Sequence, residues 1–302
     1  MARWENLVEI EPWNDTDTDW WVGLRLAWEP AFGEAQLRLL AAGRIADFAY
    51  RAVAWDDGSR VGFASIARRP GHEEAFALVL VPPEKRGQGV GSALFADLLR
   101  ESAGVTLSAA MPDDNERSLA IAEHWGFRVV SHAIRSRLEL GPGQPGPIDL
   151  LDHRVRVIDA ASPASDKLWL GPLIIDSDSS PEALELGWRT TADDFERMFP
   201  RIVWVVIEEG GKPIGAASAS PQEGDAWLLI YTGVLPSHRR QGFARLAKMH
   251  LHAVVAERGG RSLTTDNEAR NNSILELNAS LGYQPIGGEI RLRQQAGHAI
   301  LT

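Results

Sequence analysis

Hydrophobic and polar positions in the first half of the chain predict three strands, a tight turn and a helix. The three apolar runs are Arg51–Trp55, Val61–Ile66 and Phe76–Val81. The Asp57-Gly58 pair between the first two is typical of a two-residue hairpin turn. After a glycine-rich turn, Val90, Leu94 and Leu98 recur at helical spacing, so a helix follows the third strand.

The second half repeats this order of elements. Its apolar runs are Val203–Glu208, Ile214–Ser218 and Trp227–Val234, and its helical stripe is Phe243, Ala247, Leu251 and Val254. Each half then adds a short strand, at Val105–Ala109 or Leu263–Thr265. A second helix in each half ends at Gly126 or Gly282, where glycine suits a left-handed helix cap.

The two halves are alike because the sequence contains a direct repeat. The segment VPPEKRGQGVG at residues 81–91 matches VLPSHRRQGFA at residues 234–244, and Asn115 with Gly126-Phe127 matches Asn271 with Gly282-Tyr283. The breaker run GPGQPGP at residues 141–147 predicts a linker between the copies. The sequence therefore predicts an α/β protein with mixed sheets and two repeated domains, at residues 1–140 and 148–302.

The glycine-rich turn of each copy has the chemistry of an anion site. A strand that enters Arg-x-x-Gly-x-Gly/Ala and leaves as a helix directs several backbone N–H groups at one point, with the positive end of the helix dipole behind them. Small residues let a phosphate approach that backbone. Neither turn has the glycine spacing of a dinucleotide fold or the Gly-Lys-Ser/Thr of a P-loop.

Composition excludes several other classes of protein. The 302 residues are 44% hydrophobic and include no cysteine, so a sizeable core is available, while disulfides, thiolate metal sites and cysteine nucleophiles are excluded. The formal charge of -10 argues against a nucleic-acid partner and favours cationic partners such as amines. No histidine spacing indicates a metal site. The charged first residues and the absence of a long apolar run predict a cytoplasmic protein without a membrane segment.

These motifs resemble those of the GCN5-related N-acetyltransferase (GNAT) family, in a tandem arrangement, over most of both halves. The resemblance implies two acyl-CoA N-acyltransferase domains whose turns bind the pyrophosphate of acetyl-CoA. The residues implied are Arg86, Gly87, Gln88, Gly89, Val90, Gly91 and Ser92 in the first half, and Arg239, Arg240, Gln241, Gly242, Phe243 and Ala244 in the second. Val81 and Val234 would pair their backbone with pantetheine, and Asn267 and Asn271 would also contact the coenzyme.

The catalytic groups that the family often uses are absent from both halves. Phe76 and Leu229 stand where a glutamate base is common, which leaves Tyr231 as the candidate for proton transfer in the second half. Ala122 and Asn278 stand where a tyrosine often assists the departing thiolate, and Asn278 can donate a hydrogen bond but no proton. The second half therefore has more polar side chains at these positions, and we expect the first half to be catalytically degenerate.

Two acidic clusters next to tryptophans are candidates for binding a cationic acceptor. They comprise Asp15, Asp17 and Asp19 beside Trp20 and Trp21, and Asp176, Asp178, Asp193 and Asp194 near Trp188. Helix caps and solvated loops explain both clusters more simply.

The sequence favours direct acetyl transfer from acetyl-CoA to a primary amine of a small molecule. A non-catalytic coenzyme A binding or sensing module, and a protein lysine or N-terminal acetyltransferase, remain the alternatives. The acceptor and the oligomeric state stay open.

Overall fold

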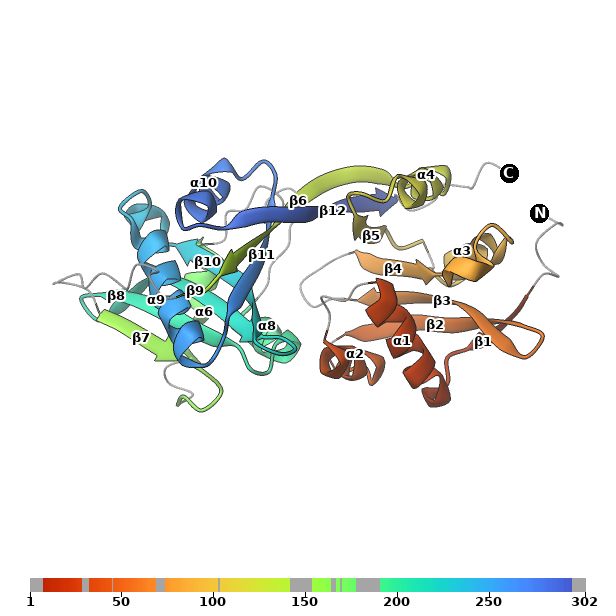
Figure 1. Ribbon diagram of the computed structural model, residues 1–302, viewed down its shortest axis with the longest axis horizontal. Helices are drawn as coiled ribbons and strands as arrows, with labels where there is room; N and C mark the ends of the chain where they lie inside the picture. Colours follow the sequence, from red (N-terminus) through yellow and green to blue (C-terminus); the bar gives the residue numbers. More distant parts are fainter. Residues whose placement is uncertain are drawn as a thin grey trace. The chain divides into compact units, whose positions relative to one another are not determined.

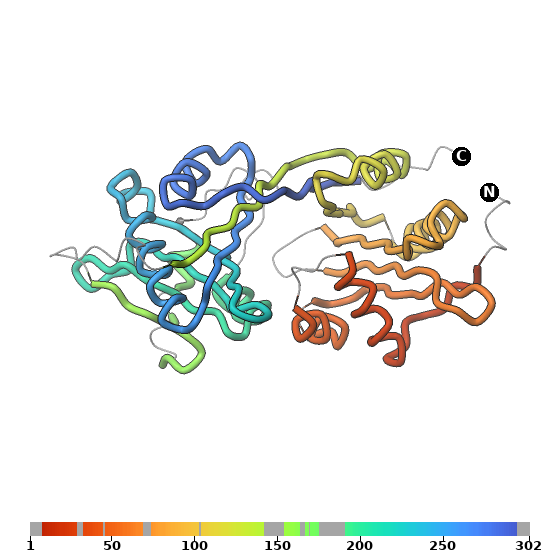
Figure 2. The backbone as a smooth tube through the Cα atoms, viewed as in Figure 1, coloured from red at the N-terminus to blue at the C-terminus, as the bar shows by residue number. Residues whose placement is uncertain are grey.

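A computed structural model describes residues 8–28, 33–44, 46–68, 74–102, 104–141, 154–163, 167–168, 170–177 and 191–294. The chain, traced in Figure 2, folds as two compact units. Unit 1 comprises the chain up to Met111, Asn115–Val130 and the segment from Ile290 onward, and unit 2 comprises Pro112–Asp114 and Ser131–Glu289. Both units combine helices with a mixed sheet, which confirms the predicted fold class.

Unit 1 has a sheet in the order β1-β2-β3-β4-β5, with helices on both faces (Figure 1). Its elements are β1 (Glu9–Pro12), a 3-10 turn (Asp15–Asp17), α1 (Thr18–Trp28), α2 (Glu34–Ala41), β2 (Asp47–Asp56), β3 (Ser59–Arg68), β4 (Ala75–Leu80), a 3-10 turn (Pro83–Lys85), α3 (Val90–Glu101), β5 (Leu107–Pro112) and α4 (Glu116–His124). The helices α1 and α2 cover one face and α3 covers the other, so the sheet is buried on both sides.

Unit 2 repeats this plan, with its sheet in the order β11-β10-β9-β8-β7. The remaining elements of the chain are β6 (Arg128–Glu139), β7 (Arg154–Ile158), α6 (Leu170–Ser177), α8 (Ala192–Met198), β8 (Val203–Glu209), β9 (Lys212–Pro221), β10 (Ala226–Val234), a 3-10 turn (Pro236–His238), α9 (Phe243–Glu257), β11 (Ser262–Glu268), α10 (Asn272–Ser280) and β12 (Gln284–Gln294).

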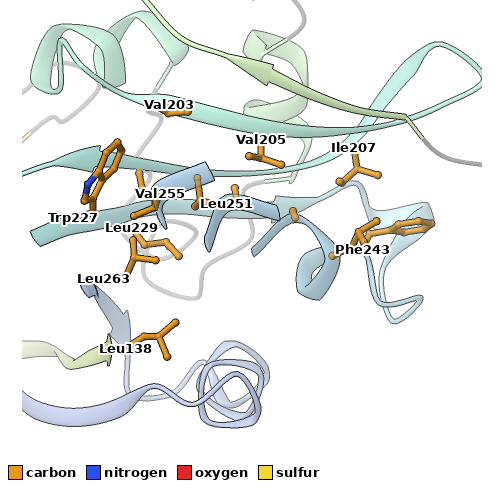
Figure 3. Close-up of a cluster of buried hydrophobic side chains, with 14 of the residues drawn as sticks. Leu138, Val203, Val205, Ile207, Trp227, Leu229, Phe243, Leu251, Val255 and Leu263 are labelled. Atoms are coloured by element: carbon orange, nitrogen blue, oxygen red, sulfur yellow. The ribbon is translucent and has the colours of Figure 1, made fainter. Parts of the chain in front are cut away.

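Strand alternation explains the two cores of unit 2. Val203, Val205 and Ile207 of β8 face α9 and pack with Leu251 and other side chains of that helix, as Figure 3 shows. The intervening Trp204 and Val206 face the opposite side, where α6 and α8 cover the sheet. Because both faces are buried, β8 is almost continuously apolar.

The predicted elements all occur in the structure, with small shifts of their ends. Asp57 (φ 46°) and Gly58 (φ 71°) form the predicted hairpin turn, because both adopt the left-handed conformation that this turn needs. Gly126 (φ 83°) and Gly282 (φ 94°) are left-handed caps as expected. The prediction of a strand beginning at Val105 was wrong, since β5 begins at Leu107.

Each unit is completed by a strand that comes from the other half of the chain. From Ser131 onward β6 belongs to unit 2, where it pairs antiparallel with β11 and contributes Leu138 to the core. From Ile290 onward β12 belongs to unit 1, where Leu292 is fully buried. The compact units are therefore not contiguous in sequence. The predicted linker lies outside the described residues from Pro142 onward, and the sequence division at residues 140 and 148 stays a prediction.

No helix in the described part of the chain combines the length and apolar character needed to cross a bilayer.

Candidate functional site

A gap opens between the two central strands of unit 2. The parallel strands β10 and β11 pair only from Ala226–Ser262 to Leu228–Thr264, and both continue beyond that point. Along its other edge β11 pairs with β6 over its whole length, so the open edge of β11 faces β10. Backbone groups on both sides of this gap are thereby available to an extended ligand.

A β-bulge in β10 lies at the closed end of the gap. The register with β9 shifts between Leu229 and Tyr231, which leaves Ile230 as the extra residue. As a result Ile230 and Tyr231, although consecutive, both pack on the face covered by α6 and α8. In unit 1 the strands β4 and β5 also separate after one short paired stretch, but β4 keeps an unbroken register with β3.

The turn after each gap holds its backbone in the left-handed conformation at two positions. In unit 1 these are Gly87 (φ 79°) and Gly89 (φ 86°), and in unit 2 they are Arg240 (φ 61°) and Gly242 (φ 89°). Left-handed residues alternating with ordinary ones turn successive N–H groups inward, which creates an anion-binding concavity. Arg240 adopts this conformation without being glycine, which costs about 1 kcal/mol or more.

The helix that follows each turn begins without a side-chain cap. Gly89 is the N-cap of α3 and Gly242 the N-cap of α9, and neither has a side chain that could bond the first amides. The first helical hydrogen bonds are donated by Ala93 and Leu246, so the amides of residues 90–92 and 243–245 precede them. An anion at this point would satisfy amides that other helices cap internally.

The arginine and glutamine that both turns share stabilise the shape of each turn. Arg86 Nε donates to the carbonyl of Val81 at 3.0 Å, and Arg239 Nε donates to that of Val234 at 3.2 Å. The two glutamines make equivalent bonds: Gln88 Nε2 to Glu84 O at 3.0 Å and Gln241 Nε2 to Ser237 O at 3.2 Å. The residues predicted to bind the pyrophosphate are thus brought together in both units, and the side chains of four of them bond to the main chain of the turn.

A buried polar network on the α9 side of unit 2 joins two predicted site residues, Asn267 and Asn278, to Lys248, which the sequence did not single out. Lys248 Nζ donates to Asn278 Oδ1 at 2.6 Å, and Asn278 Nδ2 donates to Asn267 Oδ1 at 2.7 Å. Thr265 Oγ1 lies 3.5 Å from the same oxygen of Asn267. The side chains of Lys248 and Asn278 are 0% and 2% exposed, respectively. The chain Lys248–Asn278–Asn267 therefore links the helix after the turn to the open stretch of β11.

A second buried pair flanks this network. Tyr283 places its ring 5.1 Å from Lys248 Nζ, and its hydroxyl lies 2.9 Å from His252 Nε2. Burial lowers the pKa of His252 to about 3, with a contribution from the nearby Lys248, and burial raises the pKa of the Tyr283 hydroxyl. Both groups are thus neutral at pH 7. Burial lowers the pKa of Lys248 to about 7.

Unit 1 fills the equivalent positions with apolar side chains. The repeat aligns Lys248 with Phe95, and Asn267 and Asn278 with Met111 and Ala122, all of which belong to the buried core. Phe95 stacks on Trp125, with ring centroids 4.2 Å apart, and Trp125 also approaches Gly91 of the turn. Unit 1 therefore retains the anion-binding turn, but its described residues form no comparable polar network beside it.

Tyr231, the candidate for proton transfer, lies in an aromatic cluster on the opposite face of the sheet. Its ring centroid is 5.6 Å from that of Trp204 and 5.8 Å from that of Phe195. Two polar atoms on this face, Trp204 Nε1 and Ser218 Oγ, are buried without a hydrogen-bond partner among the described residues. Leu229, at the position where a glutamate was considered, is 4% exposed in the α9 core.

Other predicted residues have structural roles. Asn271 Oδ1 accepts from Ile274 N as the N-cap of α10, and Asn115 makes the same cap on α4, so capping explains why the repeat shares this asparagine. A contact between Asn271 and the coenzyme stays a prediction. Val90 and Phe243 are buried and Ser92 is exposed, which leaves the amides of these residues as the groups that face the turn.

The acidic clusters behave mainly as caps and ion pairs. Asp17 is buried, caps the amide of Asn14 and pairs with Arg60 at 2.8 Å, and Asp19 pairs with Arg38. Asp194 forms a capping box with Thr191. Asp178 and Trp188 lie outside the described residues, as does the side chain of Asp176. No group of three or more histidine, aspartate or glutamate side chains within the described ranges is arranged to hold a metal ion.

Comparison with known proteins agrees with this geometry. The model of the acetyltransferase (GNAT) family matches residues 172–283, and that of the acetyltransferase (GNAT) domain matches residues 48–129. Together the two matches cover more than half of the chain and include both turns. The chain is a tandem member of the GNAT acetyltransferase family.

Relatives of this tandem GNAT protein match between 76% and 97% of its length. A mycothiol acetyltransferase from Nocardia farcinica (strain IFM 10152) is 25% identical over 243 residues, which cover 76% of this chain and 77% of the relative. Among solved structures, a tandem GNAT protein from the clavulanic acid biosynthesis pathway has a TM-score of 0.77 at 20% identity, covering 97% of this chain and 99% of its own. A GCN5-related N-acetyltransferase from Sphaerobacter thermophilus has a TM-score of 0.72 at 15% identity, covering 97% of both chains. At these identities the structural likenesses concern the fold.

Proposed function

We propose that this tandem GNAT protein transfers an acetyl group from acetyl-CoA directly to a primary amine of a small molecule, and that unit 2 performs the transfer. The observation that carries the proposal is the combination in unit 2 of an open strand gap with an uncapped, left-handed turn at its end. The family membership supports acyl transfer, and the absence of cysteine from the sequence favours direct transfer without a covalent enzyme intermediate.

The residues of the turn fit a pyrophosphate. At Gly242 an added Cβ would meet nothing within 4 Å, so the space in front of the backbone is open, while φ of 89° disfavours any side chain there. The amides of residues 243–245 would donate to phosphate oxygens. The helix dipole contributes about 0.3–1 kcal/mol per charge, so most of the affinity must come from these bonds and from the rest of the ligand.

The edge of β10 fits the pantetheine arm of coenzyme A, which is extended and contains amide groups. Leu235 N donates to Ile214 O on the β9 side, and because successive residues alternate, the amide of Val234 faces the gap. The carbonyl of Val234 already accepts from Arg239, so the amide is the group we expect to pair with pantetheine. This arm would bring the thioester toward the bulge at Ile230.

The acceptor amine would then approach from the side of the aromatic cluster. Aromatic faces attract a cationic amine, and the unpartnered Trp204 Nε1 and Ser218 Oγ could bond polar groups of the acceptor. The amine must lose a proton before it attacks, since at an ordinary pKa of about 10.4 it is almost entirely protonated at pH 7. Tyr231, just past the bulge, is the group of β10 that we propose for relaying this proton, with water as the final acceptor.

A coenzyme A binding module without turnover is the second candidate. It is favoured by the burial of Leu229 in the apolar core, at the position where the family often has a glutamate base. In that case the same turn would bind the coenzyme, and no amine would be acetylated.

Calorimetric titration with acetyl-CoA, followed by a thiol-release screen of small amines, separates the two candidates. The proposed function predicts binding and release with at least one amine, whereas binding without release for any amine or peptide supports the module. The variant G242E should abolish both signals, because a carboxylate would stand in the phosphate position.

The matched control is G259E. Gly259 lies at the other end of the same helix, with φ of 85° and no atom within 4 Å of an added Cβ, so it carries similar backbone strain. Retained binding in G259E would show that the loss in G242E is local. If G242E bound acetyl-CoA normally, the turn of unit 2 would not be the pyrophosphate site.

A further inference from the structure

Lys248 is a buried ionisable group that the proposed proton transfer does not use. It is fully buried, it bonds the neutral Asn278, and no carboxylate pairs with it among the described residues. A buried lysine without a counter-charge is destabilising, so its presence calls for a compensating role. Unit 1 shows that this position does not need a lysine, since Phe95 occupies it there.

The hydrogen-bond network connects Lys248, through the side chain of Asn278, to Asn267 on the strand that borders the gap. Pairing of β10 with β11 stops at Leu228 and Thr264. Extension of the same register along both strands would place Asn267 opposite the part of β10 that follows the bulge. Asn267 stands on the open stretch of β11, and its side chain is bonded to Asn278, the partner of Lys248. The network thus adjoins the inner end of the gap, where the proposed function places the thioester.

The bond from Lys248 also fixes the orientation of the Asn278 amide. An ammonium group has no acceptor atom, so only the amide oxygen of Asn278 can face it. Its Nδ2 must then face away, toward Asn267 Oδ1, and carries a second N–H for which the described residues provide no acceptor. Lys248 accordingly keeps the N–H groups of Asn278 on the side away from the ammonium, which is the side of Asn267 on β11.

We propose that Lys248 is a positioning residue for the leaving group, which orients the Asn278 amide toward the thiolate sulfur and supplies the positive charge behind it. This inference rests on the proposed function. In the reaction, the acceptor nitrogen forms a bond to the acyl carbon, the carbon–sulfur bond breaks, and its electron pair goes to sulfur. The nitrogen gives up its proton to water, and the sulfur leaves as a thiolate that accepts a hydrogen bond from Asn278 Nδ2.

The electrostatics around Lys248 suit this role. The titratable groups packed against it are His252, one turn further along α9, and Tyr283, and both are neutral at pH 7. The nearest carboxylates of β11 are engaged elsewhere: Asp266 pairs with Arg135, and Glu268 with Arg270. With its pKa lowered to about 7, Lys248 is about half protonated at pH 7. An anion that arrives in the gap would raise this pKa and hold Lys248 in its ammonium form, so that the two charges stabilise each other.

The test measures the pKa of the thiol of bound coenzyme A from the ultraviolet absorbance of its thiolate. In the wild-type protein we expect this pKa to lie below the ordinary value of about 8.5. In K248M it should rise by about one pH unit or more, as expected for loss of a nearby opposite charge. K212M, which replaces an exposed lysine by the same residue, is the control and should leave the thiol unchanged.

Kinetics supply an independent readout. K248M should lower kcat by about 10- to 100-fold with KM for acetyl-CoA changed less than about threefold, because the effect arises as the thiolate departs. The double variant K248M/N278A removes both partners of the Lys248–Asn278 hydrogen bond, so neither of them is left buried and unpaired if the single variant is unstable. It should show the same raised thiol pKa.

Failure of the proposed function and failure of the role of Lys248 give different results. If the wild-type protein does not bind coenzyme A at all, the proposed function fails. If it binds coenzyme A and the thiol pKa is the same in the wild type, K248M and the double variant, Lys248 has only a structural role and the inference is overturned.

Discussion

The two units share a fold and a turn but differ in the six side chains that surround the helix after it. Unit 2 has Lys248, His252, Thr265, Asn267, Asn278 and Tyr283, where unit 1 has Phe95, Leu99, Ala109, Met111, Ala122 and Phe127. The apolar set gives unit 1 a conventional core, with the stacked rings of Phe95 and Trp125 at its centre. The polar set gives unit 2 a buried cation, which costs stability. The two units thus share the turn and are distinguished by the side chains beside the gap.

The backbone of the two units also differs, and the irregular features lie in unit 2. Only β10 carries a bulge at the closed end of its gap, and only the unit 2 turn holds a non-glycine residue, Arg240, in the left-handed conformation. Irregular and strained backbone tends to be retained where it serves a site. Both features therefore support the proposal that unit 2 carries the chemistry.

The largest expected contrast is between equivalent glycines of the two turns. G242E should lower kcat/KM for acetyl-CoA by about 1000-fold, or about 4 kcal/mol of transition-state stabilisation. G89E, at the matching position of unit 1, should leave it within about twofold. Steady-state thiol-release assays on both variants measure this. Loss of activity in G89E with retention in G242E would reverse the assignment of the units.

The second prediction concerns the folding stability that is lost when a lysine is buried in unit 1. F95K should destabilise the protein by about 3–5 kcal/mol, because it removes a buried aromatic ring and places an ammonium among apolar core side chains. A96K, on an exposed position of the same helix, is the control. Adding A122N to F95K should recover part of the loss by restoring the acceptor that unit 2 has. Denaturant unfolding measures all three, and equal stability of F95K and A96K would contradict the comparison.

The smallest effect is a dependence of stability on pH that only unit 2 should show. With the pKa of Lys248 lowered to about 7, the folded protein has lost this proton above pH 7 while the unfolded chain keeps it up to about pH 10.5. Unfolding then takes up a proton, so the free energy of unfolding rises with pH by at most about 1.4 kcal/mol per pH unit relative to K248M. Denaturant titrations between pH 7.5 and about 9.5, above the range where histidine titrates, measure this difference. Parallel curves for the two proteins would contradict it.

Local patterns allowed the strands, the turns and the repeat to be predicted from sequence, because each depends on neighbouring residues. The Asp57-Gly58 hairpin and the caps at Gly126 and Gly282 follow from the turn chemistry of glycine. The bulge at Ile230 gave no such signal, since it lies within an unbroken apolar run. The exchange of strands between the units depends on pairing between distant segments, which periodicity does not encode.

Asn267 and Asn278 of the polar network were predicted as site residues, whereas Lys248 and His252 were not, although the sequence contains a signal for these two. Lys248 and His252 are four residues apart, so they share a helix face with the apolar stripe of α9. Aligning the repeat would have placed Lys248 over Phe95, a charge in the place of a large core side chain. A polar residue at a core position of one copy alone is the observation that indicates a special site, but its hydrogen-bond partners required the structure.

The reciprocal exchange of strands has a consequence for biosynthesis and for dissection of the protein. Unit 1 lacks part of its core until Ile290–Gln294 has left the ribosome, although the rest of it is synthesised first. Fragments cut at residues 141–147 would each carry a strand that belongs to the other unit and miss one of their own. Co-expression of the two fragments, rather than purification of either one, is therefore the appropriate way to dissect this molecule.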